Sequence, residues 1–238
     1  MIYSSISDVG KVRKNNQDNY SNLIRDDFSL FVVADGMGGY QGGEVASKIA
    51  VDSILEYIVE RPSDVNYESI VERSIVYAND NILESSKKNP EYESMGTTIV
   101  CVLIADNIAY ISHLGDSRVY LHRNKKLKQI TKDDSYIQSL IDTGIEDIDK
   151  EILNKYKNIV TKALGVDKSI EVNSLKIELH QGDYILLTTD GLTNLVNDNE
   201  IEEVINMDID LQEATDILTY MANSSGGFDN ITMTLVEI

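Results

Sequence analysis

Long apolar segments are missing from this sequence. The longest uninterrupted apolar run is Ile99–Ala105, far short of the roughly 20 residues that a helix needs to cross a bilayer. The first residues, MIYSSISDVG, lack the basic stretch followed by an apolar one that is typical of a secretion signal. We therefore expect a cytoplasmic protein without membrane insertion.

Cysteine and histidine are also scarce. The single cysteine, Cys101, excludes an internal disulfide and a cysteine-rich metal site. The arginine that a cysteine-dependent phosphatase would need six residues later is Asn107, so we interpret Cys101 as a small buried hydrophobic residue. His113, His122 and His180 are dispersed and form no HExxH motif. We interpret them as structural or surface residues, which excludes a histidine-bound zinc enzyme.

Basic residues are few. Lysine and arginine number 21 against 40 aspartates and glutamates, which gives 238 residues a net charge of −19. The densest basic run is the short Arg123–Lys128. Phosphate backbones and anionic membranes repel such a protein, so we expect no nucleic-acid partner. With two prolines and no linker or repeat, residues 1–238 are expected to form one domain. We also expect a monomer.

The apolar residues that are present predict a layered α+β fold. Stretches rich in β-branched and aromatic residues predict strands, and Asp106-Asn107 predicts a tight hairpin turn. Three- and four-residue spacing of apolar side chains predicts helices over Glu44–Glu60 and Tyr67–Lys88, and a capping-box spacing from Asp210 predicts another over Leu211–Ser224. The polar stretch 132–165 predicts a surface insertion with one or two short helices. The predicted strands are Phe28–Ala34, Thr98–Ala105, Ile108–His113, Arg118–Leu121, Tyr184–Thr189 and Ile231–Val236.

A glycine-rich segment, Gly36–Gly43, does not match the known phosphate-binding loops. A dinucleotide-binding motif starting at Gly36 would need glycine where Gln41 stands, and a P-loop starting at Gly38 would need lysine where Glu44 stands. Nucleotide-binding enzymes of these two types are excluded.

Four aspartates stand at the ends of predicted strands: Asp35, Asp116, Asp190 and Asp229. Turn chemistry explains any one of them, above all in Asp-Gly pairs. Four carboxylates gathered at one end of a sheet would repel each other unless a cation lay among them. Oxygen ligands without histidine or cysteine favour Mg²⁺ or Mn²⁺. The spacing alone leaves a metal cluster and independent turns both open.

Six motifs in a fixed order resolve this choice, because together they resemble the metal-dependent protein phosphatase family (type 2C) in its compact bacterial serine/threonine form. The resemblance runs from about residue 4 to the end of the chain. It implies a four-layer α-β-β-α sandwich of two antiparallel sheets flanked by helix pairs. The motifs are Ser7–Asp18, Asp35–Gly39, Met95–Thr98, Gly115–Arg118, Thr189–Leu192 and Phe228–Thr232.

The resemblance also implies an activity. Phosphoserine and phosphothreonine in proteins would be hydrolysed by direct attack of a hydroxide that bridges two Mn²⁺ or Mg²⁺ ions. Asp35, helped by the main-chain carbonyl of Gly36, would bridge the ions. Asp190 and Asp229 would hold one ion, and Asp18 would anchor the other through water.

Two further residues receive roles from the same resemblance. Asp116 would hold a third, weaker ion, and Arg13 would bind the substrate phosphate, for which a planar guanidinium is suited. The partners implied are phosphorylated proteins and a cognate, membrane-anchored Ser/Thr kinase.

Three departures from the family pattern concern the site. Met37 stands where many eukaryotic members have a histidine that protonates the leaving group, and Gln17 replaces a glutamate. The stretch 132–165 corresponds to the family's flap, yet it reads Asp133-Asp134-Ser135 where bacterial members have Asp-His-Ser.

Two alternatives stay beside the main hypothesis. One is a catalytically inactive member that serves as a binding module, which is disfavoured because none of the implied metal-binding aspartates is missing. The other is the sporulation or stress-response branch, which lacks the R-x-x-N-x-D element that is intact here from Arg13 to Asp18.

Overall fold

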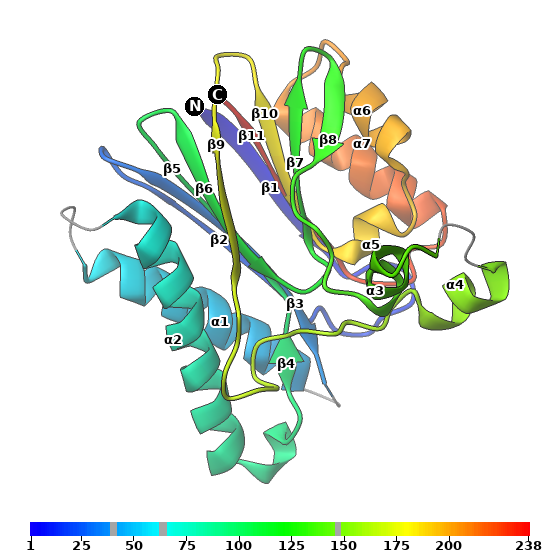
Figure 1. Ribbon diagram of the computed structural model, residues 1–238. Coiled ribbons are helices and arrows are strands. Elements are labelled where there is room, and N and C mark those ends of the chain that lie inside the picture. The colour runs from blue at the N-terminus through cyan, green and yellow to red at the C-terminus, as the bar shows by residue number, and fades with distance from the viewer. Residues whose placement is uncertain (39–41, 62–65, 146–148) are drawn as a thin grey trace.

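The computed structural model describes residues 1–38, 42–61, 66–145 and 149–238. Two antiparallel sheets lie face to face, and helices cover their outer faces (Figure 1). The predicted layered α+β architecture is confirmed.

One sheet has the strand order β1-β11-β10-β7-β8. Its first and last strands in the sequence, β1 and β11, pair along their whole length, so the two chain ends lie side by side in Figure 1. Its strands are β1 (Ile2–Asp8), β7 (Arg118–Arg123), β8 (Lys126–Gln129), β10 (Tyr184–Thr188) and β11 (Ile231–Glu237).

The other sheet has the order β2-β3-β5-β6-β9, with β4 paired to β3. The predicted turn at Asp106-Asn107 joins β5 to β6, and both residues have positive φ, 50° and 59°, as a tight two-residue hairpin requires. The strands are β2 (Asp18–Ile24), β3 (Ser29–Met37), β4 (Gly96–Thr97), β5 (Ile99–Ala105), β6 (Ile108–Leu114) and β9 (Asn173–Glu178).

Two helix layers complete the sandwich. Helices α1 (Gly42–Val59) and α2 (Tyr67–Lys88), followed by the 3₁₀ turn Pro90–Tyr92, cover one sheet. Helices α6 (Asp198–Ile205) and α7 (Leu211–Ser224) cover the other. No helix in the described part of the chain is both long and apolar enough to span a membrane.

The buried apolar side chains form three separate cores, because successive residues of each strand point to opposite faces of its sheet. In β3, Leu30, Val32 and Ala34 face helices α1 and α2, whereas Phe31 and Val33 face the opposite sheet. Cys101 lies in the helix-facing core as a free, buried thiol whose pKa is raised by burial. This confirms its interpretation as a packing residue.

The stretch between β8 and β9 carries α3 (Tyr136–Asp142) and α4 (Lys150–Tyr156), in agreement with the predicted insertion with short helices. Ser135 caps α3 through a hydrogen bond from the Gln138 N–H. A short strand-like contact between Ser135 and Val160 closes the insertion at its base.

The start of one predicted helix differs from the prediction. Only half of the capping box predicted at Asp210 forms: its side chain accepts from the Glu213 N–H. The reciprocal pair of bonds occurs instead at the start of α6, between Asn197 and Glu200.

Candidate active site

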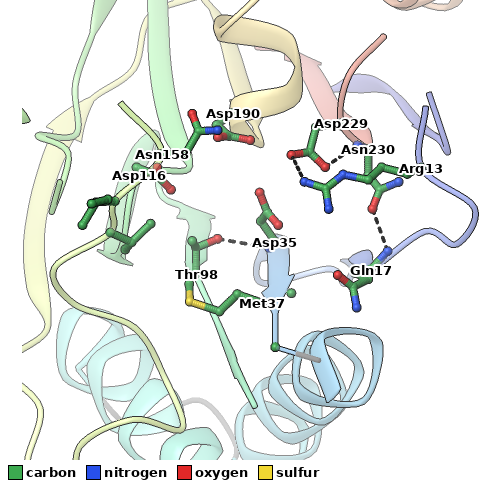
Figure 2. A pocket seen from close by; sticks show the side chains of 14 residues that line it. Arg13, Gln17, Asp35, Met37, Thr98, Asp116, Asn158, Asp190, Asp229 and Asn230 are labelled. Carbon is green, nitrogen blue, oxygen red and sulfur yellow. Dashed lines mark hydrogen bonds and ion pairs between the residues drawn. The ribbon is translucent and has the colours of Figure 1, made fainter. Parts of the chain in front are cut away.

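A pocket of about 500 Å³ opens where the strand ends of the two sheets meet (Figure 2). Antiparallel register brings the first two carboxylates together, because Asp18 of β2 stands directly opposite Asp35 of β3. Asp190 is the first residue of the short helix α5 (Asp190–Thr193), just after β10. Asp229 lies just before β11, and Asp116 lies in the connection from β6 to β7.

Asp35 is fixed through its backbone. Its N–H donates to the Thr98 hydroxyl at 3.0 Å, and its carbonyl oxygen accepts from the Thr98 N–H at 2.9 Å. The Thr98 hydroxyl is in turn 2.7 Å from that of Ser117, next to Asp116. Figure 2 shows the Asp35 carboxyl pointing into the pocket. Burial raises its pKa well above the ordinary value, and the charge of Asp18 raises it further.

Gly36 sits where no side chain would fit. A Cβ there would overlap the backbone carbonyl oxygen of Gly43 at the start of α1. The absence of a side chain lets β3 and α1 approach closely and leaves the Gly36 backbone on the pocket wall.

Asp18 lies behind the pocket wall rather than on it, and is 6% exposed. One oxygen, Oδ2, accepts from the Thr189 hydroxyl at 2.9 Å, whereas Oδ1 has no hydrogen-bond partner. Burial raises the pKa of Asp18 to about 7, with a further contribution from the charges of Asp190 and Asp229.

Asp116 and Asp190 both line the pocket and lie near each other on one side of it in Figure 2. Burial, then repulsion from Asp190, raises the pKa of Asp116 to about 7. Asp190 accepts from the Asn194 amide at 2.8 Å through Oδ2, while its buried Oδ1 has no partner. Burial, then the charge of Asp229, raises the pKa of Asp190.

Arg13 is the basic residue among those that line the pocket in the described ranges. Its guanidinium donates to Asp229 Oδ2 at 2.7 Å, with half of the arginine side chain exposed. The other oxygen, Oδ1, accepts from the Asn230 N–H at 2.9 Å. The cluster therefore contains more negative than positive charge.

These carboxylates fit divalent cations by chemistry, although the described residues contain no group of three acidic, histidine or cysteine side chains already gathered around one point. One oxygen of Asp229 is engaged by Arg13. Asp18 and Asp190 each have a buried oxygen without a hydrogen-bond partner, and since buried polar atoms are normally satisfied, these two oxygens fit a role as cation ligands.

The insertion reaches the same pocket. Residues 158–160 line it, and in Figure 2 the Asn158 side chain lies near Asp116 and Asp190. Arg118 connects the base of the insertion to the Asp116 loop through a bidentate ion pair with Asp133. Its Nε donates to Oδ1 at 2.9 Å and its Nη2 donates to Oδ2 at 2.7 Å. Met37 lines the opposite side.

All the predicted metal- and phosphate-binding residues lie in this pocket or, for Asp18, directly behind it. Sequence reasoning gave no role to Thr98 or to Asn230, whose side chain accepts from the Gln17 N–H at 2.8 Å. Thr98 stands inside the motif Met95–Thr98 and Asn230 inside the motif Phe228–Thr232. Their place in these motifs was the signal that could have identified them.

Comparison with known proteins agrees with this geometry. The family model described as protein phosphatase 2C matches residues 11–226. The serine/threonine phosphatase stp of Listeria monocytogenes serotype 4b is 36% identical over 237 residues, which cover 97% of this chain and 93% of that relative. Protein phosphatase PhpP of Streptococcus pneumoniae serotype 2 is 34% identical over 244 residues, which cover 100% and 98%.

Solved structures agree as well. The catalytic domain of the serine/threonine protein phosphatase PstP, in complex with two manganese ions, is similar with a TM-score of 0.87 and 33% identity. The likeness covers 99% of this chain and 97% of that one.

Proposed function

This chain belongs to the protein phosphatase 2C family, and on that premise we propose that the pocket between its sheets is where phosphate is removed from phosphoserine and phosphothreonine side chains of proteins. The chain is a metal-dependent protein serine/threonine phosphatase. The observation that supports the location most directly is the surplus of carboxylates, with two unpartnered oxygens, facing one arginine.

The family resemblance supplies the proposed ligands, and the structure places them on the pocket wall or directly behind it. Asp35 with the Gly36 carbonyl, Asp190 and Asp229 would hold the ions, and Asp18 would act from behind the wall through water. Bound there, the two cations would supply an activated water for attack on phosphorus and would offset the charge of the phosphate. Asp116, 7% exposed and near Asp190, is proposed to hold a weaker third ion.

The chain's own residues bind and orient the substrate. Arg13 is half exposed at the rim and offers a planar pair of donors to two phosphate oxygens. The described lining contains no histidine or cysteine, and the Thr98 hydroxyl is engaged by the Asp35 N–H and Ser117, so no hydroxyl, thiol or imidazole nucleophile stands beside a base there. The lining aspartates are proposed to hold cations, so we expect attack by water without a phosphoenzyme. Met37 has no proton to give, so the leaving serine or threonine oxygen takes its proton from water.

The proposal also covers the domain organisation, the oligomeric state, the opposing kinase and the location of the protein. We assign residues 1–238 to one catalytic domain with the insertion 132–165 as its flap. We propose that it acts as a monomer. A phosphatase acts on what a kinase produces, so we propose a bacterial Ser/Thr kinase as its opponent and the cytoplasm as its location. Mg²⁺ and Mn²⁺ both suit the oxygen ligands.

The test is hydrolysis of a phosphothreonine peptide by protein dialysed against a chelator. We expect turnover only after Mn²⁺ or Mg²⁺ is added back, with no phosphorylated protein in an acid-quenched reaction. Turnover that survives chelation, or a trapped phosphoenzyme, would overturn the mechanism. A protein that binds Mn²⁺ and phosphopeptide without turnover would favour the inactive binding module instead.

A further inference from the structure

A buried asparagine beside the pocket, Asn230, contacts both ends of the loop that carries Arg13. Its Nδ2 donates to the Val9 carbonyl oxygen at 2.9 Å and to the Asn15 carbonyl oxygen at 3.0 Å. Its Oδ1 accepts from the Gln17 N–H at 2.8 Å. One side chain, 4% exposed, therefore fixes the loop on both sides of Arg13.

The loop has little regular structure of its own. It joins β1 to β2 without helix or strand. The N–H groups of Lys11 and Val12 donate to the Gly227 carbonyl oxygen at 2.8 and 3.2 Å, which attaches the residues before Arg13. The residues after it are held by one main-chain hydrogen bond, from the Gly36 N–H to the Gln17 carbonyl oxygen at 3.2 Å, and by side-chain contacts, among them those of Asn230. The guanidinium itself contacts Asp229, so its position depends on that ion pair and on the loop backbone that the Asn230 amide holds.

Asn230 is itself firmly placed relative to the carboxylates. Its N–H donates to Asp229 Oδ1 at 2.9 Å. Its carbonyl oxygen packs so tightly on Gly191, next to Asp190, that a Cβ at residue 191 would overlap it. Asn230 thus connects the backbone beside two of the proposed metal ligands to the loop of Arg13.

We propose that Asn230 is a positioning residue that holds Arg13 at the distance from the carboxylate cluster where it can bind the substrate phosphate. The proposal rests on the function proposed above. An amide suits this place because it donates two hydrogen bonds and accepts one, whereas a carboxylate only accepts. Without the anchor, Arg13 would sample more positions, and small misplacements of a binding group can weaken binding on the order of a hundredfold.

The test compares Asn230→Ala, Arg13→Ala and the double variant, using a phosphothreonine peptide and inorganic phosphate as a competitive inhibitor at saturating Mn²⁺. We expect Asn230→Ala to raise both KM and the inhibition constant of phosphate about tenfold, with kcat changed less than about threefold. In the Arg13→Ala background the same substitution should change KM by less than about twofold, because the contact it supports is already gone.

Two controls keep the roles apart. Asn79 is a matched residue away from Arg13: 1% exposed, it accepts from the Gly165 N–H at 2.8 Å and donates to the Asp167 carbonyl oxygen at 2.9 Å. Asn79→Ala should lower the melting temperature without raising KM. Calorimetric titration should show the same Mn²⁺ affinity for Asn230→Ala as for the parent. Should Asn230→Ala not fold, Asn230→Asp keeps the size, loses both donated bonds and should raise KM likewise.

The outcomes separate this inference from the function on which it rests. If Arg13→Ala raises KM and Asn230→Ala does not, or if Asn230→Ala acts equally in both backgrounds, the positioning role is wrong. If Asn230→Ala lowers kcat and Mn²⁺ affinity with KM unchanged, it acts through Asp229 and the inference is overturned. If Arg13→Ala leaves KM and phosphate inhibition unchanged, the proposed role of Arg13 itself fails.

Discussion

Replacing Asp18 by asparagine should stabilise the metal-free protein, although it removes a proposed part of the metal site. The Asp18 carboxyl is 6% exposed, and one of its oxygens has no partner. Burial and the neighbouring carboxylates raise its pKa from 3.8 to about 7. An acid whose pKa is raised by folding makes the folded state the stronger proton binder. Stability is therefore fully present below the unfolded pKa of 3.8 and is lost as the pH rises toward 7.

The magnitude follows from the same pKa. The difference between 3.8 and about 7 corresponds to about 4 kcal/mol of unfolding free energy above pH 7. Asparagine keeps the size of the side chain and carries no charge. The unfolding free energy of metal-free Asp18→Asn should therefore be higher than that of the parent by up to about 4 kcal/mol at pH 8, and by less than about 1 kcal/mol at pH 4. For a chain of this size each kcal/mol shifts the melting temperature by roughly 2–4 °C.

The assay is thermal and urea unfolding of chelator-treated protein from pH 4 to pH 8. Asp183 provides the opposite control, because it is buried and yet has a lowered pKa. Burial raises its pKa, but the hydrogen bond and charge of the Arg123 guanidinium, 2.6 Å away, together with the hydrogen bond from the His180 N–H, lower it by more. Asp183→Asn should destabilise the protein at pH 8 by leaving Arg123 unpaired. Added Mn²⁺ should stabilise the parent more than Asp18→Asn. If metal-free Asp18→Asn is less stable than the parent at pH 8, or its advantage does not shrink toward pH 4, the reasoning is refuted.

Three substitutions test separate roles in turnover. Asp35→Asn should lower kcat more than Asp18→Asn, because Asp35 lies on the pocket wall and Asp18 behind it; equal residual kcat would contradict the bridging role. Arg13→Ala should lower kcat/KM by roughly ten- to a hundredfold, mainly through KM, and a loss confined to kcat would contradict phosphate binding in the ground state. Asp116→Ala should keep tight Mn²⁺ binding and the melting temperature of the metal-bound protein while losing turnover, whereas unchanged kcat at saturating Mn²⁺ would refute a third-ion role.

The sequence predicted best the parts of the fold that are apolar on both faces. The strand predicted at Thr98–Ala105 forms as β5, which is buried throughout between a helix layer and the other sheet. Strand β1 was not predicted because the face that it turns to the other sheet is polar: the Ser5 and Ser7 hydroxyls lie 2.8 Å from those of Thr234 and Thr232 in β11, and Ser5 also accepts from the Asn22 amide of β2. Such hydroxyl pairing across strands leaves no apolar alternation to detect.

The edge strands were missed for a related reason. Strand β9, NSLKIE, alternates half-buried and exposed residues at a sheet edge and carries little apolar signal. Strand β2 has few large apolar residues, yet it places Asp18 opposite Asp35. Their predicted proximity came from motif resemblance, since strand pairing is not encoded in either segment alone.

The sequence predicted the acidic residues of the site more completely than the residues that hold them and Arg13 in place. Aspartates at strand ends can be detected because each directly follows or precedes a strand that the pattern of apolar residues predicts. The role of Asn230 depends on contacts with Val9, Asn15 and Gln17, more than 200 positions away in the sequence. Only the folded chain brings these segments together.

The central claim is that this carboxylate cluster binds a pair of divalent cations, and a calorimetric titration of Mn²⁺ into metal-free protein tests it without any substrate. We expect two ions per chain, with protons released as carboxyls of raised pKa ionise. The proton release should appear as a heat that depends on the buffer. Asp35→Asn, folded by circular dichroism, should lose most of this binding. Absence of Mn²⁺ binding to the parent, or binding that Asp35→Asn leaves unchanged, would contradict the claim.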